Sequence, residues 1–263
     1  MILLYDHPFS PYSQKVKIAL REKGMAFETQ LPGGLGAGGA GGEFRDANPR
    51  AEVPTLVDGE TAVFDSTIIL EYLEDKQPDP ALLPVSPAER ARVRMLEDVM
   101  DTHYEAINWA VSEIRAFKRA EGEKAQALLA TAGSQLHGFF QWLEGQLGNR
   151  EWFNGEQFGW GDLAVAPYLN GSRGHGFSPP AQPRLSAWLE RVNARSSVAE
   201  TVREATEMAR TAPMTSVADL VERGLFKREY RDHRLEWMVK SGGVEIVLKG
   251  LERENIRFGP DFA

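Results

Sequence analysis

The sequence predicts a small α/β domain followed by an all-helical domain, and three observations support this fold class. The first 77 residues alternate short apolar runs with helical patterns. Residues 78–87 contain four prolines, which stop helices and are typical of a linker. Beyond the linker, apolar residues recur at helical spacing. We therefore expect an α/β domain at 1–77, a linker at 78–87, a helical domain at 88–212 and a helical extension at 213–263.

The α/β domain opens with a strand, a helix and a second strand. Apolar runs predict strands at 2–5 and 27–31. Between them Gly24 stands where a C-terminal glycine cap would fall. A helix is predicted over 11–23 from residues that recur at spacings of three and four: Val16, Ala19, Leu20 and Lys23. This order is sufficient for one parallel β-α-β crossover.

A glycine-dominated stretch and a hairpin follow. Residues 33–42 cannot pack a core, and no Gly-Lys-Ser/Thr follows them, so we expect a flexible loop rather than a phosphate-binding loop. Strands at 53–57 and 61–64 are joined by Asp58-Gly59, which tolerates the positive φ angles of a hairpin turn. A helix from about residue 66 completes the domain, with an apolar face formed by Ile68, Ile69, Tyr72 and Leu73.

The rest of the chain is helical in pattern. Three apolar stripes predict long amphipathic helices, and they run through Val93, Leu96, Met100 and Tyr104, through Leu136, Phe139, Phe140 and Leu143, and through Leu185, Trp188, Leu189 and Val192. Beyond Pro213 two further amphipathic patterns are separated by Gly242-Gly243. We expect this tail to pack back on the body and to narrow a cleft or a dimer interface.

The composition excludes several classes of function. The 263 residues contain no cysteine, so the chain can form no disulfide, no cysteine-ligated metal site and no cysteine nucleophile. The 30 basic and 38 acidic residues give a net charge of −8, which argues against nucleic acid as a partner. Without a secretory signal or an apolar run of roughly 18 residues, we expect a soluble cytoplasmic protein with no membrane partner.

Three loop positions carry residues suited to an anion or a peptide. Ser10 precedes the first helix, where it can serve as a helix N-cap or can donate its hydroxyl to an anion that the helix N-terminus already attracts. In a cis Val53–Pro54 bond, the backbone of Val53 could pair with an extended peptide. Asp65-Ser66 begins the next helix and could bind an ammonium and a carboxylate. Together these loops suggest a zwitterionic, peptide-like ligand.

These motifs, in this order, resemble the glutathione transferase superfamily. The resemblance covers about four fifths of the chain. It rests on Ser10-Pro11-Tyr12-Ser13, on Asn48-Pro49 followed by Val53-Pro54-Thr55-Leu56, on Asp65-Ser66-Thr67-Ile68, on Phe158-Gly159-Trp160-Gly161-Asp162 and on Trp188-Leu189-Glu190-Arg191.

The resemblance implies a thioredoxin-like N-terminal domain, a helical-bundle C-terminal domain and a homodimer. It implies that Val53 and cis Pro54 bind the cysteinyl backbone of glutathione, and that Asp65 and Ser66 bind its γ-glutamyl end. The residue that activates the thiol would be Ser10, with Ser13 as the second candidate. The second-substrate cleft would draw on Tyr12, His103, Tyr104 and Trp109.

The sequence departs from the family pattern at two places. Family members often carry a basic residue or glutamine before Val-Pro, whereas Glu52 stands here, so Arg45 or Arg50 would have to bind the glycine carboxylate. Gly159 stands where the family usually has Ser or Thr three residues before Asp162, and we expect a weakened helix cap there.

The resemblance implies a glutathione transferase of serine type that attacks a small hydrophobic electrophile, with glutathione as co-substrate and with no cofactor or metal. Two alternatives stay open. One is a glutathione-dependent lyase or ether-cleaving enzyme on the same scaffold, and the other is a non-catalytic glutathione- or ligand-binding protein.

Overall fold

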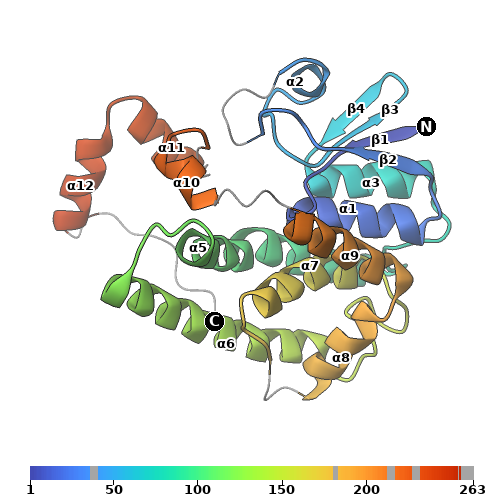
Figure 1. Cartoon of the computed structure of the whole chain (residues 1–263). Coiled ribbons are helices and arrows are strands. Elements are labelled where there is room, and N and C mark those ends of the chain that lie inside the picture. The colour runs from blue at the N-terminus through green and yellow to red at the C-terminus, as the bar shows by residue number, and fades with distance from the viewer. Residues whose placement is uncertain (36–40, 180–182, 212–216, 227–231, 254, 256–263) are drawn as a thin grey trace.

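The computed structural model describes residues 1–35, 41–179, 183–211, 217–226, 232–253 and 255. It consists of a four-stranded sheet with helices on it, packed against a bundle of longer helices (Figure 1). The fold class predicted from the sequence is confirmed: a thioredoxin-like domain precedes a helical domain. Half of the glycine stretch at 33–42, residues 36–40, lies outside the described residues.

The sheet has the strand order β2-β1-β3-β4. β1 pairs in parallel with β2, while the β1–β3 and β3–β4 pairs are antiparallel. The strands are β1 (Ile2–Tyr5), β2 (Phe27–Gln30), β3 (Thr55–Asp58) and β4 (Thr61–Phe64). β3 begins two residues later than the sequence predicts, because Pro54 has no N–H to donate to a strand partner.

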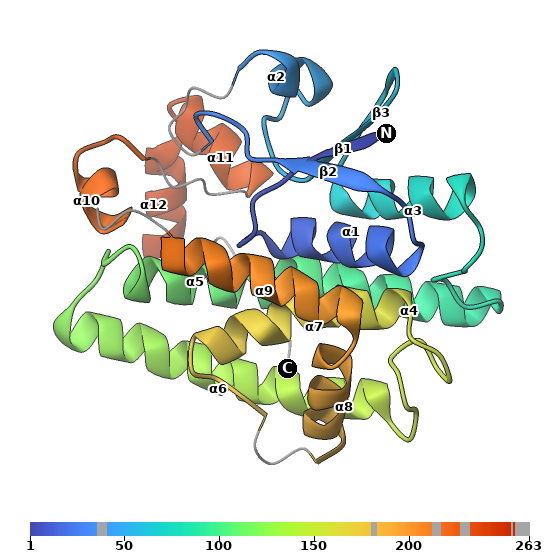
Figure 2. The ribbon, with the colours of Figure 1, turned by 45° about the vertical axis from the view of Figure 1, so that its right-hand side comes forward.

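Two helices cover one face of the sheet and a short one lies on the other side (Figures 1 and 2). They are α1 (Pro11–Glu22) and α3 (Ser66–Lys76) on the first face, and α2 (Glu43–Ala47) opposite. Helix α1 begins where predicted, because Pro11 lacks the N–H that a first-turn position leaves unpaired and Ser10 caps the helix.

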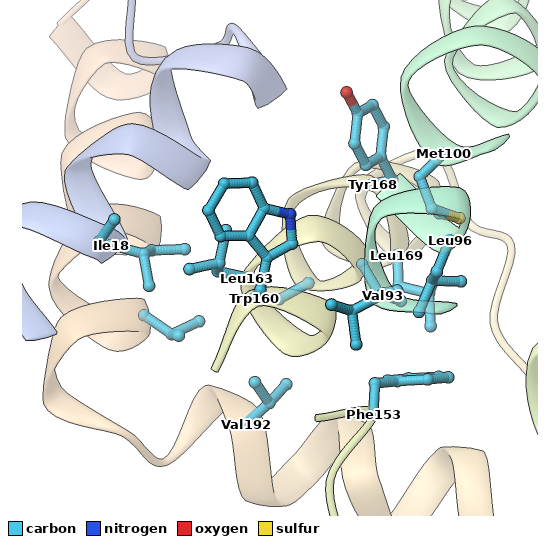
Figure 3. Packing of buried hydrophobic residues seen from close by; sticks show 14 of the residues in the cluster. Ile18, Val93, Leu96, Met100, Phe153, Trp160, Leu163, Tyr168, Leu169 and Val192 are labelled. Carbon is cyan, nitrogen blue, oxygen red and sulfur yellow. The ribbon is translucent and has the colours of Figure 1, made fainter. Parts of the chain in front are cut away.

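The helical domain is built around α7. Its helices are α4 (Pro87–Val99), the π-turn η1 (Met100–Tyr104), α5 (Glu105–Arg115), α6 (Gly122–Leu147), α7 (Trp160–Gly174), α8 (Pro183–Asn193) and α9 (Ser196–Thr211). In α7 the residues from Trp160 to Leu169 are all buried. Figure 3 shows Trp160 and Leu163 of α7 between Ile18 of α1 and Val93 of α4, so one core spans both domains.

The start of α7 is held by a buried carboxylate. Asp162 is fully buried and accepts from the backbone N–H groups of Phe153 (2.8 Å), Asn154 (3.2 Å) and Gly159 (3.1 Å) and from the indole of Trp188 (2.8 Å). A Cβ at position 159 would lie 2.2 Å from Asn154 Nδ2 and 2.3 Å from the carbonyl oxygen of Leu82. Close packing therefore requires glycine here, which is the physical reason for the departure from Ser or Thr at this position.

The described part of the C-terminal extension contains three short helices. They are α10 (Val217–Glu222), α11 (His233–Lys240) and α12 (Val244–Glu252), and Figures 1 and 2 show them grouped beside the C-terminal end of α5. The ring of Phe226 stacks on that of Phe117 at 5.8 Å, just after α5. The described part of the extension thus contacts the body, while its contribution to the shared core is small because that core ends at Val202.

Candidate functional site

The sheet register brings the three predicted loops to one edge. Tyr5, the last residue of β1, pairs with Thr55, the first residue of β3. Thr55 pairs in turn with Phe64, the last residue of β4. The loop before α1, the Val53–Pro54 bond and the Asp65 turn therefore leave the sheet at the same end. Because α1 and α3 both begin there, the positive ends of their dipoles favour an anion at this edge.

The first of these loops presents Ser10. Its Oγ accepts from the backbone N–H of Ser13 at 3.3 Å, which leaves the hydroxyl proton available to a ligand. The loop is fixed from inside by three bonds: Ser10 N–H to the His7 carbonyl (2.8 Å), Phe9 N–H to His7 Nδ1 (3.2 Å) and the Gln14 amide to the Pro8 carbonyl (2.7 Å). The hydroxyl of the half-buried Ser10 thus stands at the first turn of α1, on a loop that these three bonds hold.

Ser13, the second candidate for the catalytic hydroxyl, is 0% exposed and its Oγ has no partner among the described residues. A bound thiol could not reach it without displacing the first turn of α1. The structure therefore corrects the sequence-based alternative, and Ser10 remains as the candidate.

The Asp65 turn lies on the other side of Thr55. Asp65 adopts a positive φ of 72°, which is uncommon for a residue with a side chain and concentrates at functional sites. Its carboxylate accepts from the N–H groups of Thr67 (3.0 Å) and Ile68 (3.3 Å), and so caps α3. Ser66 is buried beneath it, at 4% exposure. Asp65 is exposed and could meet a ligand ammonium on its open side.

The Val53–Pro54 bond is cis, as the resemblance implied. The turn before it is held by Asn48, which donates to the carbonyl of Glu52 at 2.9 Å and to Thr55 Oγ1 at 3.0 Å. The Glu52 carbonyl also accepts from Thr55 Oγ1 at 3.0 Å. These bonds fix the turn that leads into Val53.

Arg50 shares an open depression with Asp65. The depression has a volume of ≈ 480 Å³ and is bordered by Phe64 and Ile68 as well. The guanidinium of Arg50 lies 5.5 Å from the ring centre of Phe64, a cation–π distance. Two residues predicted to bind glutathione are therefore brought to one surface, with opposite charges.

The four predicted second-substrate residues lie in different settings. Tyr12 is half-buried and donates its hydroxyl to the carbonyl of Asp101 at 2.7 Å, and Lys15 Nζ lies 5.9 Å from the centre of its ring. His103 is exposed on η1 and Trp109 is half-buried on α5. Tyr104 is fully buried against Phe139 and hydrogen-bonds Ser172 at 2.8 Å, and burial raises its pKa. Tyr104 is thus a core residue, which corrects its assignment to the cleft.

The sequence reasoning missed two residues of the loop before α1. Phe9 is 50% exposed beside Ser10 and offers an apolar surface to a ligand. His7 is largely buried, which lowers its pKa, and its Nδ1 accepts from Phe9. A neutral His7 therefore carries its proton on Nε2. The period-two pattern of β1 ends before these residues, so the pattern alone did not indicate them.

The described residues contain neither a candidate metal site nor a candidate membrane span. No group of three or more His, Cys, Asp or Glu side chains among them could hold a metal ion. In the same part of the chain no helix combines the length and the apolar character needed to cross a membrane.

Comparison with known families agrees with this geometry. Residues 4–81 match the glutathione S-transferase N-terminal domain, and residues 79–196 match the glutathione S-transferase C-terminal domain. The chain belongs to the glutathione transferase superfamily. The two matches join at the proline-rich segment and together cover the sheet edge and the helices packed on it.

Individual relatives of this transferase-family protein carry two kinds of name. It is 31% identical over 213 residues, 78% of its length, to the stringent starvation protein A homolog of Haemophilus influenzae, of which 92% is covered. It is 28% identical over 206 residues, 77% of its length, to the glutathione S-transferase GstB of Escherichia coli K12, of which 98% is covered. A structure of rice GST1 in complex with glutathione matches with a TM-score of 0.66 and 28% identity, covering 85% of this chain and 96% of that one.

Proposed function

We propose that the protein is a serine-type glutathione transferase that conjugates glutathione to a small hydrophobic electrophile. The observation that carries this proposal is the Ser10 hydroxyl, half-exposed at the first turn of α1 with its proton uncommitted to Ser13. In this proposal the backbone of Val53 binds the cysteinyl unit of glutathione. Asp65 and Ser66 bind its γ-glutamyl end, and Arg50 is the candidate for its glycine carboxylate.

Ser10 would act by stabilising the thiolate of glutathione. A free thiol has a pKa of about 8.5, so a shift of about two units supplies most of the nucleophile at pH 7 and corresponds to about 2.7 kcal/mol. A hydroxyl donor together with the N-terminus of α1 can provide an interaction of this size. The thiolate then forms a carbon–sulfur bond, the leaving group departs with its electron pair, and the thiol proton passes to solvent.

A non-catalytic glutathione- or ligand-binding protein is the second candidate. Two observations favour it: the carboxylate of Glu52 directly before Val53, and relatives that are named as starvation proteins rather than transferases. A lyase or ether-cleaving enzyme would use the same Ser10 and would differ in the cleft.

We also propose that the protein is a cytoplasmic homodimer. The exposed Ile68 of α3 and Met95 of α4 support the dimer, and the Arg94–Glu71 ion pair links these two helices.

Turnover assays distinguish these functions. We expect the wild-type protein to consume a generic aryl halide with glutathione and to bind glutathione in calorimetry. Faster consumption of an aryl ether than of the halide would instead indicate the cleaving enzyme. Glutathione binding without turnover of either substrate would contradict the transferase proposal and favour the binding protein.

The extension is proposed to shape the cleft. Removal of residues 213–263 takes away the Phe226–Phe117 stack but, among the described residues, no member of the core, so we expect a folded protein with a thermal midpoint within about 4 °C of wild type. We expect the relative rates toward small and bulky electrophiles to change. Unchanged substrate range and unchanged oligomeric state in the truncated protein would contradict this role.

A further inference from the structure

A buried group of charged side chains joins the sheet domain to the helical domain close to the first turn of α1. Lys15 of α1 is 0% exposed, and its Nζ contacts Glu97 Oε1 at 2.5 Å and the Oδ2 of Asp101. Glu97 lies on α4 and Asp101 on η1. We call these three residues the Lys15 cluster. Burial opposes the charge on Lys15, but the two carboxylates outweigh this effect and raise its pKa, so the lysine stays charged.

The Glu97 carboxylate reaches the start of α3. Its Oε1 accepts from Thr67 Oγ1 at 3.0 Å, and its Oε2 accepts from the indole of Trp160 at 2.6 Å. Thr67 follows the predicted glutathione-binding pair directly, and its backbone N–H is also bound by Asp65. Glu97 therefore holds one of the two helix N-termini that face the candidate site.

Asp101 reaches the start of α1. Its carbonyl accepts from the Tyr12 hydroxyl at 2.7 Å, its Oδ2 pairs with Lys15, and its Oδ1 accepts from Tyr168 at 2.7 Å. Tyr12 lies two residues after Ser10. Asp101 itself belongs to a π-turn, a departure from regular helix that often marks a functional position. Asp101 therefore holds the second helix N-terminus, the one that carries the proposed catalytic hydroxyl.

The cluster thus links three parts of the proposed reaction site: the start of α1, the start of α3, and the helical segment from α4 to α5 that carries His103 and Trp109. Buried ionic groups tolerate few alternative geometries, because each charge loses its compensation when a partner moves. A displacement of one helix start therefore weakens the ion pairs of Lys15, and so also weakens the contacts that hold the other helix start.

We propose that Glu97 and Asp101 are positioning residues that couple the two halves of the glutathione site to each other and to the electrophile cleft. The part of this inference that concerns glutathione affinity rests on the proposed function. The part that concerns coupling between the two helix starts does not. Through the Lys15 cluster, loss of a contact at α3 loosens the loop at α1, although the two share no direct bond in this cluster.

The test uses Thr67→Val, which removes the hydroxyl that donates to Glu97 and keeps the side-chain shape. Amide hydrogen exchange is followed in the ligand-free protein, with residues 136–147 of α6 as an internal reference that the cluster does not contact. We expect the segment 10–18 of α1 to exchange about three- to tenfold faster than in wild type, relative to α6. Asp101→Asn, which weakens the pairing with Lys15, should do the same to residues 65–72 of α3.

The chain offers a matched control at the other end of α3. Asp58 accepts from Tyr72 at 2.8 Å and pairs with Lys76, so it repeats the aspartate–tyrosine–lysine arrangement away from the cluster. Tyr72→Phe and Asp58→Asn should leave exchange in segment 10–18 within about twofold of wild type. If these variants loosen α1 as much as Thr67→Val does, the effect is general destabilisation and the coupling is refuted.

Glutathione affinity tests whether this coupling affects ligand binding. We expect Thr67→Val to weaken glutathione binding about three- to tenfold in calorimetry, with the bound thiol also titrating at higher pH, because Ser10 moves with the start of α1. Exchange confined to residues 65–72 in Thr67→Val would overturn the coupling, and unchanged affinity would overturn its role in the site. Absence of glutathione binding in wild type would instead defeat the proposed function, while the exchange data would still decide the coupling.

Discussion

Asp162→Asn is expected to destabilise the protein more than other isosteric changes. The carboxylate accepts from three backbone N–H groups and the Trp188 indole in a fully buried site. The asparagine amide group would face some of these donors with donors of its own. We expect a loss of about 3 kcal/mol in the free energy of unfolding, measured by urea denaturation at pH 7.

The exposed Asp98 on α4 provides the control, because its carboxylate has no hydrogen bond or ion pair with another described residue. Asp98→Asn should change the stability by less than about 0.5 kcal/mol. An equal loss in both variants would show that the hydrogen bonds of Asp162 do not hold the start of α7.

The pH dependence of this difference has a defined sign. Burial raises the pKa of Asp162 to about 6 from its ordinary 3.8, although the four donors favour the carboxylate. The unfolded chain therefore loses this proton before the folded protein does. The proton-linked part of the Asp162 contribution is full below about pH 4 and is lost as the pH rises through about 6, so the hydrogen bonds of the carboxylate account for the difference that remains at pH 7. The stability difference between wild type and Asp162→Asn should shrink across that window.

Ser10→Ala is expected to have the largest effect on activity. It removes the proposed donor to the thiolate, so we expect kcat/KM with an aryl halide to fall tenfold or more, in line with about 1.5 kcal/mol or more for one charge-assisted hydrogen bond. The substitution also removes the N-cap of α1, which costs about 1 kcal/mol of stability. Ser10→Thr retains both the hydroxyl and the cap, and should restore most of the rate.

Ser13→Ala separates the two serines. The Ser13 hydroxyl is buried without a partner among the described residues, so its removal should leave the rate unchanged and the stability equal or higher. A large loss of rate in Ser13→Ala with little loss in Ser10→Ala would reverse the assignment of the catalytic hydroxyl.

The sequence predicted the parts of the fold that depend on neighbouring residues. The residue types of Ser10-Pro11 and Asp65-Ser66 are those that begin helices, and those of Asp58-Gly59 are typical of a hairpin turn. These local signals, together with the order of the strands, were sufficient to bring the three loops to one sheet edge.

Features that depend on distant residues could not be predicted in this way. Lys15 and Glu97 are 82 positions apart in the sequence. No local pattern indicates that Lys15, on α1, becomes buried against Glu97, on α4. Helical spacing alone does not distinguish a core position from a cleft position at Tyr104. Its burial results from contacts with Phe139 and Ser172 on other helices. At Gly159 the missing side chain is explained by Asn154 and Leu82, which the family pattern does not contain.

The pKa of the glutathione thiol bound to this protein tests the central claim most directly. Ultraviolet absorbance of the thiolate, titrated against pH with wild type and Ser10→Ala, gives this quantity without any electrophile. We predict a thiol pKa about two units below the free value of about 8.5 in wild type, and a return toward the free value in Ser10→Ala. A bound thiol that titrates near 8.5 in both proteins would contradict activation of glutathione by Ser10.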